Sequence, residues 1–92
     1  MRFTRPAEDD LRAAVAFIAR DNPAAARHVE ARVRSAARVL VEHPEIGWLS
    51  DAESLRRWQI PGTPYRLLYS VSADRITITR IWHGARGWPP AS

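Results

Sequence analysis

Apolar positions in the first part of the 92-residue chain recur with the period of a helix. Leu11, Ala14, Val15 and Ile18 follow one another at steps of three and four residues, which places them on one helical face. Asp21-Asn22-Pro23 ends this helix, because Asn is a good N-cap and Pro fits the first turn of a following helix. The pattern therefore predicts a first helix that ends near residue 20.

A second helical stripe runs from Pro23 to His43-Pro44, where the proline stops it. Its small apolar residues suit close contact between helices; they are Ala26, Val29, Val33, Ala36 or Ala37, and Leu40. Because only two or three residues separate the two helices, we expect them to form an antiparallel hairpin.

The last third of the chain changes to the period of two that is typical of strands. Residues 65–71 place Tyr65, Leu67, Tyr69 and Val71 on one face. Residues 72–74 then turn the chain into a second strand.

The strand predicted for residues 75–82 breaks its own alternation. Ile76 and Ile78 share a face, but the next large apolar residue is Ile81. A β-bulge near Thr79-Arg80 explains the slip, and so does a second apolar face beneath the tail.

Two further strands are predicted at residues 2–4 and 55–60, and residues 44–54 read as a loop. We expect Trp48 and Leu49 to pack this loop onto the core. The order β-α-α-β-β-β predicts an α+β fold, in which an N-terminal strand and an antiparallel helical hairpin pack on a small antiparallel β-sheet. We expect one domain over residues 1–92, with residues 83–92 as a C-terminal tail.

Composition excludes several classes of function. The chain has no cysteine, so disulfides and cysteine-based zinc sites are excluded. His28 and His43 have no ligand spacing, and we expect neither a metal nor a cofactor. No apolar run approaches the ~18 residues of a membrane span, and the first ten residues lack the apolar core of a signal peptide. We expect a cytoplasmic protein that does not contact membranes.

The formal net charge is +4, and all 14 basic residues are arginine. Arginine binds carboxylates and phosphates through a planar fork of donors. A GC-rich genome that encodes its basic residues as arginine would produce the same composition. The charge permits binding to nucleic acid or to an acidic protein segment and does not choose between them.

The segment from His83 to Trp88 concentrates candidate chemistry, because it holds His83, Arg86 and Trp88 within six positions. Cleavage of RNA needs an acid, a base and cations on the phosphate. His83 is the candidate acid–base group, with Arg66 and Arg80 as phosphate clamps. The alternative is a structural His83 that hydrogen-bonds a neighbouring backbone group.

Arg56-Arg57-Trp58 combines cations with an aromatic ring, as single-strand binders do. The reading that we favour is a solvated strand whose Trp58 packs inward. We expect Tyr65 and Tyr69 to lie in the core or to form the wall of a groove.

Several motifs together carry a resemblance that spans residues 2–88. They are Pro-Ala-x-x-Asp-Leu at 6–11, Phe-Ile-Ala-Arg-Asp-Asn-Pro-Ala-Ala-Ala-Arg at 17–27, a helix that ends in Leu-Val-Glu-His-Pro-Glu-Ile-Gly at 40–47, Tyr-Arg-Leu-Leu-Tyr at 65–69, Asp-Arg-Ile at 74–76 and Ile-Trp-His-Gly-Ala-Arg at 81–86. This combination resembles the ParE/RelE superfamily of bacterial type II toxins, and the ParE branch in particular. Gly87 stands where the family usually has an acidic residue.

The resemblance implies a toxin encoded with an antitoxin. In the ParE branch the antitoxin is typically a ParD-like ribbon-helix-helix dimer, which also binds the operator DNA, and two toxins and two antitoxins form the complex. ParE-branch toxins are associated with inhibition of DNA gyrase, without catalysis, and RelE-branch toxins with cleavage of mRNA on the ribosome. Because this chain has no lysine and no tyrosine after Tyr69, we favour the gyrase inhibitor. The ribonuclease and a non-toxic interaction module stay as alternatives.

Partner binding is expected to use arginines on the sheet, which suit acidic residues on an antitoxin segment. Apolar pockets between the helical hairpin and the sheet would receive its anchors. The predicted partner-binding residues are Arg56, Arg57, Arg66, Arg80, Arg86 and Trp88.

Overall fold

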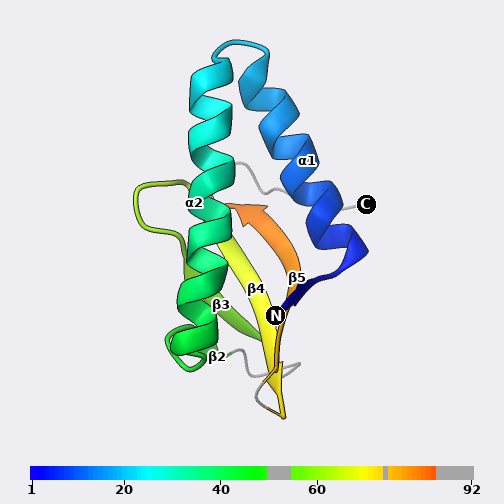
Figure 1. Ribbon diagram of the computed structural model, residues 1–92, viewed down its shortest axis with the longest axis vertical. Helices are drawn as coiled ribbons and strands as arrows, with labels where there is room; N and C mark the ends of the chain where they lie inside the picture. The colour runs from blue at the N-terminus through cyan, green and yellow to red at the C-terminus, as the bar shows by residue number, and fades with distance from the viewer. Residues whose placement is uncertain (50–54, 74, 85–92) are drawn as a thin grey trace.

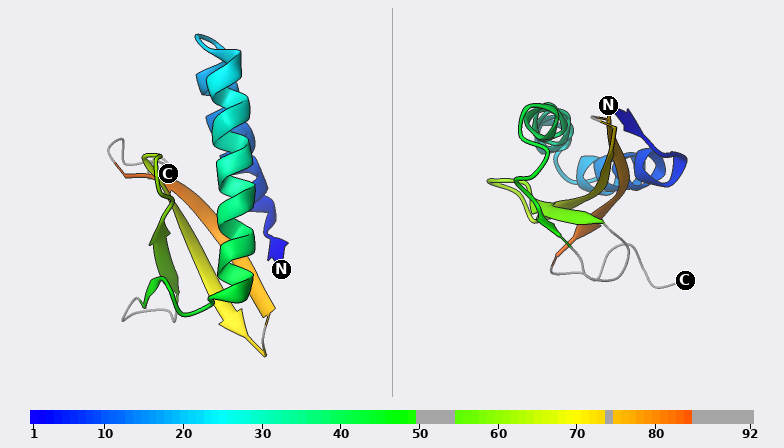
Figure 2. Two further views of the ribbon diagram at one scale, coloured as in Figure 1. Left: turned by 60° about the vertical axis from the view of Figure 1, so that its left-hand side comes forward. Right: turned by 90° about the horizontal axis from the view of Figure 1, so that it is seen from below.

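Two helices lie against one face of a five-stranded sheet (Figures 1 and 2). The structure is a computed structural model that describes residues 1–49, 55–73 and 75–84. Its elements follow in the order β1 (Arg2–Phe3), α1 (Arg5–Ala19), α2 (Pro23–Glu42), β2 (Trp48–Leu49), β3 (Arg56–Gln59), β4 (Tyr65–Ser72) and β5 (Arg75–His83). The predicted α+β class is confirmed.

Each helix begins at a side chain that caps it. The Thr4 hydroxyl accepts a hydrogen bond from the Ala7 amide at 3.2 Å, and the Asn22 side chain accepts one from the Ala25 amide at 3.0 Å. Such caps satisfy amide groups that have no partner within the first turn. Because the helices are joined by so short a turn, they pack as the predicted antiparallel hairpin (Figure 1).

The strand order is β1-β5-β4-β3-β2, and the sheet is mixed. The strands from β2 to β5 pair antiparallel, but β1 pairs parallel with β5, so the prediction of an antiparallel sheet was wrong for this strand. β1 leads directly into α1, and the Thr4 amide donates to the Ile78 carbonyl at 2.9 Å. The chain therefore enters the helix alongside β5 and in the same direction.

A β-bulge, one of the two explanations left open by the sequence, breaks the alternation in β5. Leu68 pairs with Arg80 and Tyr69 pairs with Ile78, so Thr79 is the extra residue. Its hydroxyl donates to the Leu68 carbonyl at 3.0 Å, while its own carbonyl accepts a hydrogen bond from the Thr4 hydroxyl at 2.9 Å. The bulge thus joins the sheet to the start of α1.

The core lies between the helical hairpin and the sheet. Leu11, Val33 and Leu40 pack from the helices against the sheet, which contributes Leu67 and Tyr69. The small residues Ala7, Ala14, Ala36 and Ala37 let the backbones approach closely. Trp58 packs against this core, as predicted, and Tyr65 and Tyr69 are both buried.

Two apolar expectations were wrong. Val71 was expected to share a strand face with Tyr65, Leu67 and Tyr69, which are buried, but it is 39% exposed, because the tip of the β4–β5 hairpin extends past the end of α2 (Figure 1). Trp48 and Leu49 were predicted to pack onto the core, but they are 83% and 59% exposed. They form β2, the outer edge of the sheet, which lies beyond the cover of the helices.

Candidate functional site

The sheet face that the helices do not cover carries an open depression of about 360 Å³, lined by Trp48, Arg57, Gln59 and Arg66. We call these four residues the open-face patch. The strand register brings them together, because Trp48 pairs with Arg57 across β2 and β3, and Gln59 pairs with Arg66 across β3 and β4. Residues opposite each other on antiparallel strands project from the same face.

The backbone next to Trp48 is fixed by hydrogen bonds on both polar atoms of Gly47. Its amide donates to the Tyr69 hydroxyl at 2.9 Å, and its carbonyl accepts from the Arg56 guanidinium at 2.9 Å. The Tyr69 hydroxyl also donates to the Pro44 carbonyl at 2.9 Å. Burial raises the pKa of the Tyr69 hydroxyl above its ordinary value of 10.0, although the Gly47 hydrogen bond and the Arg56 charge act against this. A neutral hydroxyl therefore holds the loop that leads into β2 and Trp48.

Gln59 orients the guanidinium of Arg66. The Gln59 side-chain oxygen accepts a hydrogen bond from Arg66 Nε at 3.2 Å, while its nitrogen donates to the carbonyls of Thr63 and Tyr65. The bond to Gln59 is the one hydrogen bond of the Arg66 guanidinium that is found among residues 1–49, 55–73 and 75–84. Arg57 is exposed, and the ion pairs between described residues use Arg12, Arg34 and Arg80.

Arg80 does not line the open-face patch and instead forms an ion pair with Asp10 on α1. Arg80 donates to the two carboxylate oxygens at 2.8 and 3.0 Å, and the Ile81 amide donates to the same carboxylate at 3.0 Å. The hydrogen bonds from Arg80 to Asp10 raise the pKa of Arg80. Because β1 pairs only with residues 77 and 78 of β5, Asp10 supplies the acceptor that a neighbouring strand would have given to Ile81.

His83 packs edge-on against Tyr65, its cross-strand neighbour, with ring centroids 5.2 Å apart. Arg66 lies on the adjacent pair of this ladder, opposite Trp82. The three residues of the ribonuclease alternative are therefore separated in their roles: His83 contacts a buried tyrosine, Arg80 pairs with Asp10, and Arg66 lines the open-face patch.

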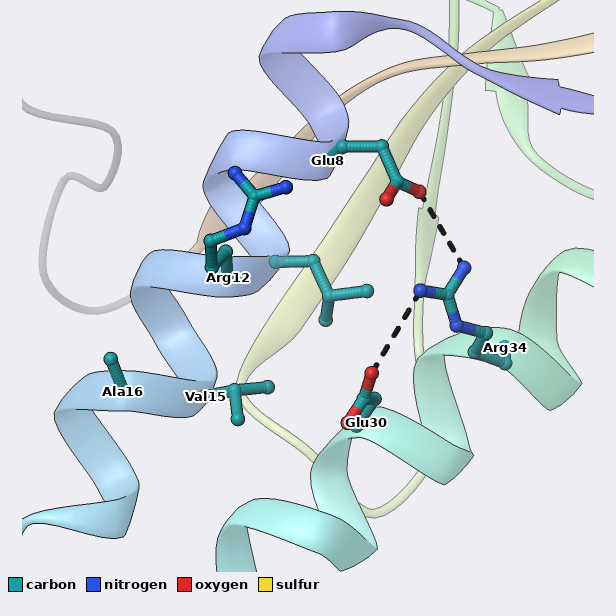
Figure 3. Close-up of a pocket in the computed structure, with 7 residues that line it drawn as sticks. Glu8, Arg12, Val15, Ala16, Glu30 and Arg34 are labelled. Atoms are coloured by element: carbon teal, nitrogen blue, oxygen red, sulfur yellow. Dashed lines mark ion pairs between the residues drawn. The ribbon is translucent and has the colours of Figure 1, made fainter.

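A second depression, also of about 360 Å³, lies between α1 and α2 and is lined by residues of both helices (Figure 3). Arg34 sits between two carboxylates, at 3.5 Å from Glu8 and 3.8 Å from Glu30. The same guanidinium lies over the Phe3 ring, 5.3 Å from its centroid. The positive charge of Arg34 is therefore offset by two carboxylates, whereas Arg57 and Arg66 of the open-face patch form no ion pair with a described residue.

The structure brings together part of the predicted partner-binding set. Arg57 and Arg66 share the open-face patch, whereas Arg56 binds backbone carbonyls of the loop before β2 and Arg80 pairs with Asp10. Arg86 and Trp88 lie outside the described residues. The sequence reasoning missed Trp48, Gln59 and Asp10. Trp48 lies in the predicted loop 44–54 and was expected to pack onto the core, so no signal in the sequence pointed to its exposed position.

Neither a metal site nor a membrane span emerges from the described ranges. No group of three or more potential metal-ligating side chains occurs in residues 1–49, 55–73 and 75–84. Within the same ranges, neither helix is long and apolar enough to cross a bilayer.

Comparison with known proteins gives consistent matches. The family model for the ParE toxin of the type II toxin–antitoxin system parDE matches residues 1–88. The chain is 34% identical over 74 residues to Y4kP of Sinorhizobium fredii (strain NBRC 101917 / NGR234), covering 80% of this chain and 76% of the relative. It is 36% identical over 77 residues to Toxin RelE2 of Caulobacter vibrioides (strain ATCC 19089 / CIP 103742 / CB 15), covering 84% and 85%.

The fold is also that of a solved structure. A chain of the chromosomal ParDE toxin–antitoxin system from P. aeruginosa superimposes with a TM-score of 0.76 at 23% identity, covering 87% of this chain and 89% of that chain. The shared fold agrees with the family match, which spans nearly the whole sequence. This chain belongs to the ParE toxin family of type II toxin–antitoxin systems.

Proposed function

We propose that this toxin inhibits DNA gyrase by binding it in the cytoplasm and that it has no enzymatic activity of its own. The observation that carries the proposal is the Asp10–Arg80 pair. The ribonuclease alternative assigns Arg80 to the scissile phosphate, yet Arg80 is held by a buried carboxylate at 2.8 Å. The match to the parDE toxin family supports the same branch.

A ribosome-dependent ribonuclease is the second candidate, because one relative at 36% identity carries the name Toxin RelE2. In that case His83 would act as acid or base and Arg66 would bind the phosphate. The two candidates make opposite demands on His83. Only the ribonuclease loses its toxicity when the imidazole is removed.

The experiment that separates them is a supercoiling assay with purified gyrase, relaxed plasmid and ATP, to which the toxin is added after removal of its antitoxin. We expect loss of supercoiling or accumulation of linear DNA. The His83→Ala variant should inhibit gyrase as the unmodified chain does. Unaffected gyrase at high excess of toxin, with growth arrest that His83→Ala abolishes, would support the ribonuclease. Expression without any effect on growth would identify a non-toxic interaction module.

The antitoxin proposed for this toxin is a ParD-like ribbon-helix-helix protein that forms a hetero-oligomer with it and links it to operator DNA. We propose that an acidic segment of this antitoxin covers Arg57 and Arg66, whose guanidinium groups have no carboxylate partner among the described residues. Charge-assisted hydrogen bonds to arginine forks are among the strongest that a surface offers.

The antitoxin surface can be tested by charge reversal. The Arg57→Glu/Arg66→Glu variant should bind the antitoxin at least tenfold more weakly in a titration. The matched control is Arg27→Glu/Arg38→Glu, which makes the same change of charge at two exposed positions of α2. If both variants bind the antitoxin equally well, the open-face patch is not its binding surface.

A further inference from the structure

We infer that the open-face patch binds single-stranded nucleic acid, with a base stacked on Trp48 and the phosphates bound by Arg57 and Arg66. This inference does not depend on the gyrase proposal, because it concerns a direct contact of the toxin freed of its antitoxin. It implies that nucleic acid and the proposed antitoxin segment compete for Arg57 and Arg66. It rests on three observations about the patch: its aromatic side chain, its charges and its amide.

The aromatic side chain is exposed but its backbone is fixed. Trp48 is 83% exposed, which makes it the most exposed of the large apolar residues in the described part of the chain. Adjacent Gly47 is held by Tyr69 and Arg56 at 2.9 Å each. A flat ring on a fixed backbone can stack with a base at a small cost in conformational entropy. Stacking on an aromatic ring does not depend on which base is bound.

The charges of the patch are available to a ligand. Arg57 is directly opposite Trp48 in the strand ladder, and Arg66 is the diagonal neighbour of Arg57 on β4, two pairs further along the β3–β4 ladder. The three side chains therefore project from the same face of the sheet. No ion pair between described residues uses Arg57 or Arg66. Two guanidinium groups that have no carboxylate partner among the described residues, placed beside an aromatic ring, form the combination that binds the sugar-phosphate backbone of a single strand.

The side-chain amide of Gln59 explains why binding should not depend on the nucleotide sequence. Both N–H groups of Gln59 donate to backbone carbonyls, at 2.7 Å to Thr63 and 3.1 Å to Tyr65, and its oxygen accepts from Arg66. Gln59 therefore has no donor left to read a base edge or a 2′-hydroxyl. We expect DNA and RNA strands of any sequence to bind similarly.

An acidic peptide would use the same two arginines but would gain little from Trp48. Nucleic acid and peptide therefore differ in their dependence on the indole ring, and this difference decides the test. Because Trp48 is so exposed, its replacement leaves the core unchanged, and a folded variant is expected.

The test measures fluorescence anisotropy of a labelled dT12 oligonucleotide with the purified toxin at several salt concentrations. Trp48→Ala should weaken binding by about 5- to 100-fold, and Trp48→Phe by much less, since a phenyl ring still stacks. Arg57→Gln/Arg66→Gln should weaken binding at least tenfold and reduce the slope of log K against log salt by about 1.4, the value for two lost phosphate contacts. An RNA oligonucleotide of the same length should bind within about threefold of dT12.

The control is Arg27→Gln/Arg38→Gln, which removes the same charge from α2 and should change binding by less than threefold. Equal weakening by both arginine pairs would mean that net charge alone attracts the oligonucleotide, and the inference would be wrong. It would also be wrong if no oligonucleotide bound, or if Trp48→Ala bound as well as the unmodified chain. Displacement by a poly-glutamate peptide with no effect of Trp48→Ala would reassign the patch to an acidic protein segment.

Discussion

The carboxylate of Asp10 accepts two hydrogen bonds from Arg80, a residue 70 positions later in the chain, and a third from the Ile81 amide. Asp10 is 6% exposed and lies in the second turn of α1, while Arg80 follows the bulge of β5. This pair therefore ties the first helix to the edge of the sheet at the point where β1 no longer pairs with it. Because the two residues lie far apart in the sequence, the ion pair forms only when α1 packs against β5.

Removing either partner should destabilise the fold. Asp10→Ala leaves the Ile81 amide buried without an acceptor, and Arg80→Ala leaves a buried carboxylate without its cation. We expect each to lower the free energy of unfolding by about 2–4 kcal/mol, less than a fully buried pair would lose, since Arg80 is partly exposed. In urea denaturation the double variant should cost about 1–2 kcal/mol less than the sum of the single variants.

The matched control for this cycle is Asp9→Ala, which breaks an exposed ion pair with Arg12 one position away. Its effect should stay below about 0.5 kcal/mol. Additive effects of Asp10→Ala and Arg80→Ala would contradict the coupling proposed for them.

The buried hydroxyl of Tyr69 predicts a loss of stability at alkaline pH. Its pKa is higher in the folded chain than the ordinary value of 10.0, so the native state keeps the proton that the unfolded state releases. This contribution is fully present below about pH 10 and is lost as the pH rises through the folded pKa. Urea titrations at pH 8 and pH 11 should therefore show a larger drop for the unmodified chain than for Tyr69→Phe. Parallel pH profiles for the two chains would refute this assignment.

Gly47 should not tolerate a side chain. A Cβ atom there would lie 2.6 Å from the Tyr69 hydroxyl and 2.8 Å from the Arg57 carbonyl. Gly47→Ala should cost about 1–3 kcal/mol of stability in thermal denaturation, and Tyr69→Phe should restore only part of it, because the Arg57 backbone stays in place. Gly84→Ala is the control, since its nearest contact would be 3.5 Å. Equal melting temperatures for the two alanine variants would contradict this account.

The Thr4 hydroxyl both caps α1 and binds the bulge in β5. Thr4→Ala removes both hydrogen bonds and should cost about 1–2 kcal/mol. Thr4→Ser keeps the hydroxyl and should retain most of this stability in the same denaturation experiment. A loss for serine as large as that for alanine would show that the methyl group, and not the hydroxyl, is the important part.

The sequence predicts the helices of this protein well because their periodicity and caps are local properties. Asn22 with Pro23 marks the boundary between α1 and α2, and the stripe that includes Val33 and Leu40 marks the buried face. The break in alternation before Ile81 likewise indicated an irregular strand, since a change of face within one strand is visible in the sequence. The sequence left a second apolar face open as the alternative, and the strand register identifies a bulge.

Contacts between residues that are far apart in the sequence produce no such pattern. Whether Arg57 or Arg80 is free depends on which carboxylate the fold brings beside it, and the pairing of Arg80 with Asp10 spans 70 positions. An acidic residue near the start of a helix is already accounted for by the helix dipole, so Asp10 gave no sign of a second role. The exposure of Trp48 depends in the same way on β2 lying at the edge of the sheet.

Thr79, the extra residue of the bulge, contributes more to the attachment of α1 than to the pairing of β4 with β5. If it were absent, Leu68 could still face Arg80 and Tyr69 could still face Ile78, because the ladder already omits Thr79. What would vanish are the carbonyl that receives the Thr4 hydroxyl and the local bend that a bulge gives to its strand. The extra residue in β5 therefore fixes the position at which α1 begins. A homologue with one residue fewer here could keep the same strand pairing, but its first helix would have to attach to the sheet through other contacts.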